Sequence, residues 1–221
     1  MPKVKSIHLM TILITRPNYD PGTNYLFYWS KLVIDFAKKR KVKILDLLGE
    51  KANKKDFISY VRKHNPKLIF FNGHGNEESV MGQNDMVLAD LKESPIFLGT
   101  VVYARSCEVA KKLGPQSVKN GAVAFIGYTK KFIIGYAPEK ITRPLDDPVA
   151  KLFLEPSNLI PISILKGNSV GNAHLKSQKA MFKNLAFMLS SAASSLQKDA
   201  ASYLWRNMKY QTVCGNGDAR I

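Results

Sequence analysis

Two apolar runs, each followed by reactive or flexible residues, constrain this chain more than any other feature. The first run is Leu68–Phe71, which leads into Asn72-Gly73-His74-Gly75, and the second is Ile96–Tyr103, which leads into Arg105-Ser106-Cys107-Glu108. Short apolar runs without polar alternation are typical of strands that are buried on both faces of a parallel sheet. Because ligands bind at the carboxyl ends of such strands, we expect an imidazole and a thiol at one edge.

The rest of the chain alternates between short apolar and amphipathic segments, which predicts strands joined by helices in a parallel sheet. Strands are predicted at 6–15, 42–48, 68–71, 96–103 and 122–127, with 132–134 as a candidate edge pairing. Helices are predicted at 25–39, 55–64, 108–113, 149–154, about 172–189 and 193–208, a small hairpin at 77–91, and a run of undecided type at 159–164. Thr23 or Asn24 is the expected cap of the first helix.

The expected architecture is one domain over 1–221, a three-layer α/β/α sandwich with a mainly parallel, about six-stranded sheet. Its core is expected at about 6–190, followed by a C-terminal helix and a flexible tail at 191–221. The first, third and fourth strands must be neighbours if the imidazole and the thiol are to share a site.

Charge and cysteine content narrow the class of protein. The net charge is +16, which makes nucleic acid a conceivable partner, but the basic residues are scattered and mostly lysine, so a solvated surface is favoured. No apolar run is long enough to span a bilayer, so no membrane partner is expected, and a cytoplasmic location is predicted. The two cysteines, Cys107 and Cys214, have no disulfide or zinc spacing.

The two strand ends indicate a catalytic site only when they are considered together, because a cysteine alone is often a small buried apolar residue. A nucleophilic thiol needs a nearby base, which His74 could supply, and backbone N–H donors that stabilise an oxyanion. Gly75 and Cys107 are the expected donors. A short helix at 108–113 would further favour negative charge on the sulfur of Cys107.

These motifs resemble the caspase–gingipain–legumain clan of cysteine peptidases, most closely the prokaryotic caspase-like proteins of the gingipain and CHAT type. The resemblance rests on Tyr19–Ser30, Leu68–Asn76, Val101–Gly114, Gly121–Tyr128 and Gly167–Ala173 and covers about residues 6–190. It implies a caspase-like fold, with His74 as general base, Cys107 as nucleophile, and no obligatory third catalytic residue. The implied reaction is acyl transfer through a thioester, followed by hydrolysis.

Two departures separate the chain from caspases themselves. Arg105-Ser106-Cys107-Glu108 stands where caspases have their Gln-Ala-Cys signature, and the cysteine follows the histidine by 33 residues rather than about 50. A preference for aspartate therefore cannot be transferred. In this clan the loop after the first strand contributes to substrate selection. In that loop, Asp20 would select a substrate with a basic residue before the cut bond, which is the option we favour. Arg16 would instead select an acidic residue. Asp20 could equally serve only to organise a turn.

The sequence thus predicts a cysteine endopeptidase that acts on peptide or protein substrates, with cleavage after a basic residue as one option. No cofactor or metal is expected. Glu108 is a further candidate for the substrate pocket, although it more plainly suits the first turn of a helix. The alternatives are an inactive caspase-like binding or scaffold protein and a basic nucleic-acid-associated protein. The oligomeric state stays open.

Overall fold

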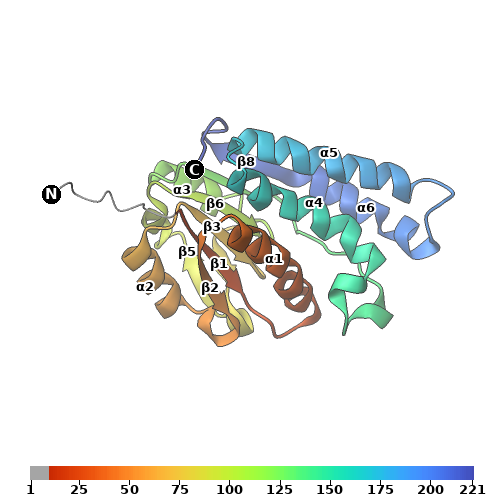
Figure 1. Ribbon diagram of the computed structural model, residues 1–221, viewed down its shortest axis with the longest axis horizontal. Coiled ribbons are helices and arrows are strands. Elements are labelled where there is room, and N and C mark those ends of the chain that lie inside the picture. Colours follow the sequence, from red (N-terminus) through yellow and green to blue (C-terminus); the bar gives the residue numbers. More distant parts are fainter. Residues whose placement is uncertain (1–9) are drawn as a thin grey trace.

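A six-stranded sheet forms the centre of the computed structural model, which describes residues 10–221 (Figure 1). The strand order is β2-β1-β3-β6-β7-β8. The strands are β1 (Thr11–Arg16), β2 (Lys43–Leu48), β3 (Leu68–Asn72), β6 (Val101–Arg105), β7 (Ala124–Tyr128) and β8 (Gln211–Gly215). All neighbours are parallel except β7 and β8. The predicted adjacency of the first, third and fourth strands is confirmed.

Helices cover both faces of this sheet, which confirms the predicted three-layer architecture (Figure 1). The helices are α1 (Pro21–Lys39), α2 (Lys54–His64), α3 (Leu113–Lys119), α4 (Pro148–Leu165), α5 (Val170–Met188) and α6 (Ser195–Tyr210). Helices α1 and α4 and the start of α5 pack on one face, and α2 and α3 on the other. Helix α6 packs outside the sheet, against α5 and α4.

Alternating side chains of the central strands enter two separate cores. Leu68 and Phe70 of β3 join the core under α1 and α4, whereas Ile69 and Phe71 join the core under α2 and α3. Every residue of β3, β6 and β7 is buried, so no polar face interrupts their apolar runs. This double burial explains why the sequence shows these strands as continuous apolar segments.

The predicted hairpin at 77–91 forms a separate two-stranded antiparallel sheet of β4 (Ser79–Met81) and β5 (Val87–Asp90). A short 3-10 turn, Gln83–Asp85, joins the two strands. Further 3-10 turns occur at Gly49–Lys51, Ser94–Phe97, Pro138–Lys140 and Pro144–Asp146. The hairpin lies directly after the His74 loop and contacts it, as described below.

Two predicted element starts are wrong, and a third is only partly described. Among the described residues the first strand begins at Thr11, and the predicted strand residues 6–9 lie outside the described part of the chain. The fourth strand begins at Val101, because the Ser94–Phe97 turn takes up the start of its apolar run. Helix α1 begins earlier than predicted, at Pro21, whose fixed φ and missing N–H suit the first helical position.

The prediction for the segment of helix α4 is also wrong. A helix was expected at 149–154 and a run of undecided type at 159–164, but one unbroken helix covers both. Pro156 and Pro161 both lie inside it. A proline cannot donate to the carbonyl four residues earlier, so Pro156 leaves the Leu152 carbonyl without its helical donor. The Asn184 side chain of α5 donates to that carbonyl at 2.8 Å. A neighbouring helix thus supplies the missing bond.

The tail was predicted to be flexible, but part of it forms a strand. Residues 211–215 form β8, which pairs antiparallel with β7 and places Cys214 opposite Phe125. The candidate strand at 132–134 is an irregular segment instead. The sixth strand of the sheet therefore comes from the C-terminal residues and not from this segment.

Candidate active site

His74 follows β3 in a loop that only glycine can form. Gly73 has φ of 140°, and a Cβ at this position would lie 2.9 Å from the carbonyl oxygen of Met81. The same close approach lets the Met81 N–H donate to the His74 carbonyl at 2.9 Å. The hairpin that follows β3 therefore fixes the backbone of His74, while the imidazole keeps a side-chain exposure of 43%.

The imidazole of His74 is held by Asp20, at a separation of 2.5 Å between His74 Nε2 and Asp20 Oδ2. Asp20 is the N-cap of α1, where its other oxygen accepts from the Thr23 N–H at 2.7 Å. Partial burial by itself raises the pKa of the Asp20 carboxyl, but hydrogen bonds from His74 and Thr23 outweigh it and leave the pKa below its ordinary value. Asp20 is therefore a carboxylate at neutral pH.

The role of Asp20 as partner of the histidine was missed by the sequence reasoning, which assigned it to substrate selection or to a turn. The signal was present, because Asp20 precedes a proline at the start of a helix, after a strand that neighbours β3. A residue in that position caps the helix and lies at the carboxyl edge where the His74 loop emerges.

Cys107 follows β6 in a tight turn and not at the start of a helix. Residues 106–112 are irregular, and α3 begins only at Leu113, so the helix predicted at 108–113 is wrong. Glu108 has φ of 59°, a left-handed conformation that a residue with a side chain adopts at a cost of about 1–2 kcal/mol. Carbonyls near the end of β7 hold the turn, since Lys130 accepts from Glu108 and Tyr128 from Ala110, both at 3.1 Å.

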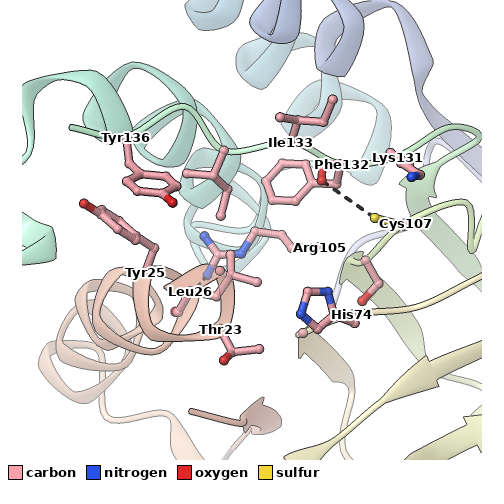
Figure 2. A pocket seen from close by; sticks show the side chains of 14 residues that line it. Thr23, Tyr25, Leu26, His74, Arg105, Cys107, Lys131, Phe132, Ile133 and Tyr136 are labelled. Atoms are coloured by element: carbon pink, nitrogen blue, oxygen red, sulfur yellow. Dashed lines mark hydrogen bonds between the residues drawn. The ribbon is translucent and has the colours of Figure 1, made fainter. Parts of the chain in front are cut away.

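The environment of the sulfur favours a neutral thiol in the resting protein. Burial raises the pKa of the Cys107 thiol above its ordinary value. The Sγ atom lies 3.7 Å from the Phe132 carbonyl oxygen, to which the thiol can donate a weak hydrogen bond (Figure 2). The helix dipole that was expected to favour the thiolate is absent here, because α3 begins six residues later.

One cavity of about 220 Å³ contains both predicted catalytic side chains. Its walls are the first turns of α1 and the segment 131–136. Figure 2 shows His74 and Cys107 at one end of the cavity and Tyr25 and Tyr136 at the other. The segment 131–136 is held by Asn207 of α6, whose amide accepts from the Ile133 N–H at 3.0 Å and donates to its carbonyl at 2.6 Å.

The predicted oxyanion donors, Gly75 and Cys107, have free backbone N–H groups among the described residues. A Cβ on Gly75 would lie 2.9 Å from both the Ser106 Cβ and the Ser79 carbonyl oxygen, so the loops after β3 and β6 touch here. Ser106 itself is buried, and its hydroxyl also lacks a partner among residues 10–221.

Beneath the cavity lies Arg105, the last residue of β6, with no exposed surface. Burial lowers the pKa of its guanidinium to about 10, so it remains charged at neutral pH. It stacks on the ring of Phe70 and donates only to neutral oxygens: Asn72 Oδ1 (2.7 Å), Asn158 Oδ1 (3.0 Å), Ser157 Oγ (3.1 Å) and the Leu26 carbonyl (3.4 Å). These bonds connect the ends of β3 and β6 with α1 and α4.

The other candidate substrate residues lie outside the cavity lining. Arg16 forms an ion pair with Asp46 and covers the ring of Phe27 at 4.4 Å. Glu108 pairs with Lys111 at 2.7 Å. The structure therefore brings His74, Gly75 and Cys107 together with Asp20, but places Arg16 and Glu108 in other contacts.

Residues 10–221 contain neither a metal-ligand cluster nor a helix that could span a membrane. No group of three or more His, Cys, Asp or Glu side chains is arranged to hold a metal ion. None of the helices in this part of the chain combines the length and the apolar character that a membrane span requires.

No protein-family model matches this sequence, and none of the curated proteins matches it either. Solved structures do share its fold. The Arg-specific cysteine proteinase gingipain R (RgpB) is similar over 98% of this chain and 48% of its own, with a TM-score of 0.64 and 11% identity. A complex of the pro- and mature domains of Porphyromonas gingivalis RgpB gives a TM-score of 0.61 at 10% identity, over 97% of this chain and 49% of that one.

A third structure, described only as a protease, has a TM-score of 0.52 at 11% identity and covers 96% of this chain and 48% of its own. The chain thus spans about half the length of the solved structures that it matches. At this level of identity the similarity concerns the fold. The caspase-like architecture that the sequence motifs predict, a mainly parallel six-stranded sheet between helical layers, is the architecture of this chain.

Proposed function

We propose that this protein is a cysteine peptidase in which Cys107 is the nucleophile and His74 the general base. One observation carries the proposal: the thiol of Cys107 and the imidazole of His74 line the same cavity, at the carboxyl ends of the adjacent strands β6 and β3. The imidazole is in addition bonded to the carboxylate of Asp20. The fold shared with RgpB supports the proposal. A closer relationship to gingipain-type or CHAT-type proteins, a peptide or protein substrate and a cytoplasmic location belong to the same proposal.

The bond between His74 and Asp20 supports a role for the other ring nitrogen in catalysis. Asp20 occupies Nε2, which leaves Nδ1 for proton exchange. When a peptide carbonyl approaches Cys107, Nδ1 accepts the thiol proton while the sulfur attacks, and the resulting oxyanion receives hydrogen bonds from the Gly75 and Cys107 N–H groups. The imidazolium then protonates the leaving amine, which yields a thioester. Water, deprotonated by His74, hydrolyses the thioester and restores the thiol.

Asp20 acts as a positioning residue in this scheme. Its carboxylate fixes the orientation of the ring and stabilises the imidazolium that forms when the thiol proton moves. Because the resting thiol is neutral, the transfer takes place as substrate binds. The preference for a basic residue would have required Asp20 in the substrate pocket, but its carboxylate is bonded to His74 and Thr23. We therefore do not assign substrate selection to Asp20.

A labelling experiment tests the proposal. The purified protein is treated with a peptidyl acyloxymethyl ketone, and intact-protein and peptide mass spectrometry locate the adduct. We expect labelling of Cys107, a loss of at least tenfold in its rate in His74→Ala, and no effect of Cys214→Ala. Labelling of both cysteines at rates that His74→Ala leaves unchanged would contradict the proposal and favour an inactive, caspase-like binding protein.

A further inference from the structure

We infer that the cavity beside Cys107 receives a neutral, apolar side chain of the substrate and rejects lysine and arginine. This inference rests on the proposed peptidase function and names the class of residue that precedes the bond to be cut. It differs from the basic preference that the loop after the first strand suggested.

The first argument is the chemistry of the lining. Among the described residues that line the cavity none is acidic, and the side chains beyond the catalytic pair are mainly apolar or aromatic: Tyr25, Leu26, Phe132, Ile133, Ile134 and Tyr136. The hydroxyl of Tyr25 donates to Asp147 at 2.6 Å. Tyr25 therefore has its polar atom committed elsewhere, and its ring is the part left to contact a substrate.

Two carboxylates next to the cavity, Asp147 and Asp20, are engaged in other bonds. Asp147 is almost completely buried, where it accepts from Tyr25 and from the backbone N–H groups of Ala137, Val149 and Ala150. Asp20 binds His74 and caps α1. Neither side chain lines the cavity. A lysine or arginine side chain that entered would therefore find no counter-ion among the side chains that line the cavity.

The charges that do border the cavity are positive. Lys131 is exposed at its rim, and the buried guanidinium of Arg105 lies beneath it. A basic substrate side chain would be desolvated next to a like charge, which is strongly unfavourable. An acidic side chain gains little from Arg105, because the guanidinium has no exposed surface and already donates to neutral oxygens.

The size of the cavity suits one side chain. Its volume of about 220 Å³ is below the roughly 300–1,000 Å³ of common small-molecule sites. The wall formed by residues 131–136 is bonded to Asn207, so this volume does not depend on a loose loop. A leucine, methionine or aromatic side chain can place its apolar surface against Leu26 and Ile134. Removing this apolar surface from water makes binding of the side chain favourable.

The test is a set of three peptidyl acyloxymethyl ketones that are identical except for leucine, lysine or aspartate at the residue next to the warhead. The second-order rate of Cys107 labelling is measured for each by mass spectrometry. We expect the leucine compound to react about 100-fold faster than the lysine compound, and faster than the aspartate compound. Faster reaction of the lysine or aspartate compound, still dependent on His74, would overturn this inference alone. Absence of His74-dependent labelling by all three would overturn the proposed function with it.

A matched pair of variants sharpens the test. Ile134 is half-buried and lines the cavity, so Ile134→Asp adds a carboxylate and Ile134→Asn adds a neutral side chain of the same shape. We expect the lysine-to-leucine rate ratio to rise at least tenfold in Ile134→Asp relative to Ile134→Asn. An equal ratio in both variants, with native circular dichroism, would contradict the assignment of this cavity. The wild-type series is decisive even where a variant does not fold.

Discussion

His74 and Cys107 follow neighbouring parallel strands and line one cavity, yet the protein holds them in opposite ways. The His74 loop is shaped by Gly73 and held by the hairpin, and its partly exposed imidazole is bonded to the carboxylate of Asp20. The Cys107 turn passes through a left-handed Glu108 and is bonded to β7, and its partly buried thiol lies against a carbonyl.

In the proposed mechanism, this difference means that the base is arranged before substrate arrives and the nucleophile is not. A carboxylate already orients the ring of His74, whereas burial keeps the sulfur of Cys107 in its neutral form. A thiol of this kind reacts slowly with small electrophiles, and faster once a bound carbonyl and the base act together. The comparison yields four predictions.

The largest effect is expected from Asp20→Ala, which removes the partner of His74. A general base contributes about 10²–10⁴-fold, and we expect loss of its positioning to lower kcat by about 10–100-fold, with little change in KM. In Asp20→Asn the helix cap is retained, because asparagine caps as well as aspartate, but the negative charge is lost. Steady-state kinetics with a peptide substrate measures both variants.

Ser169→Ala serves as the matched control, because Ser169 caps α5 as Asp20 caps α1. Both alanine variants should lose about 1 kcal/mol of unfolding free energy. Only the change at Asp20 should reduce kcat. If both changes reduced kcat alike, the effect would come from stability, and the imidazole would not depend on the carboxylate.

Asn207→Ala probes the Cys107 side, because Asn207 bonds the wall that covers the thiol. The part-buried N–H and carbonyl of Ile133 would lose their partner, so we expect about 1 kcal/mol less unfolding free energy in urea denaturation. Iodoacetamide should label Cys107 faster. Asn184→Ala, which removes one bond between α5 and α4, should destabilise without changing labelling. Equal labelling in both variants would show that the wall does not shield the sulfur.

The pH dependence of labelling tests the neutral thiol directly. Burial raises the pKa of Cys107, and only the thiolate reacts, so the iodoacetamide rate should still be rising at pH 8.5, about the pKa of an ordinary thiol. The Cys214→Ala protein isolates the signal. A rate that is already at its plateau near pH 7 would indicate a preformed thiolate and would remove the contrast between the two strand ends.

The smallest effect is expected from Glu108→Gly. Glycine relieves the strain of the left-handed backbone at position 108. The substitution also removes the ion pair with Lys111, and glycine loses more backbone entropy on folding than glutamate does. These contributions oppose one another, so the unfolding free energy should change by no more than about 0.5 kcal/mol. Thermal unfolding measures it. A loss well beyond that value would mean that the Glu108 side chain has a further structural part in the turn.

The sequence predicted those parts of the fold that depend on local pattern. The runs at Leu68–Phe71 and before Cys107 are strands because both of their faces are buried, which an apolar run without alternation indicates. The shared edge of His74 and Cys107 followed from the geometry of parallel strands. Their catalytic roles stay predictions until they are measured.

What sequence reasoning missed depends on contacts between distant residues. Asp20 reaches His74 across 54 positions, and the local pattern places Asp20 at the edge of the sheet without specifying His74 as its partner. The residues after Cys107 do not continue as a helix, because the β7 end accepts the Glu108 and Ala110 N–H groups. In α4, a donor from α5 compensates for Pro156.

Strand β8 has a consequence for how this protein can be handled. It covers the outer border of β7, whose unpaired backbone would otherwise be open to pairing with another molecule. Removal of residues 211–221 should therefore favour self-association. Cys214 sits in that strand opposite Phe125, partly buried, so its reactivity toward a thiol reagent offers a built-in gauge of whether the border of the sheet is intact.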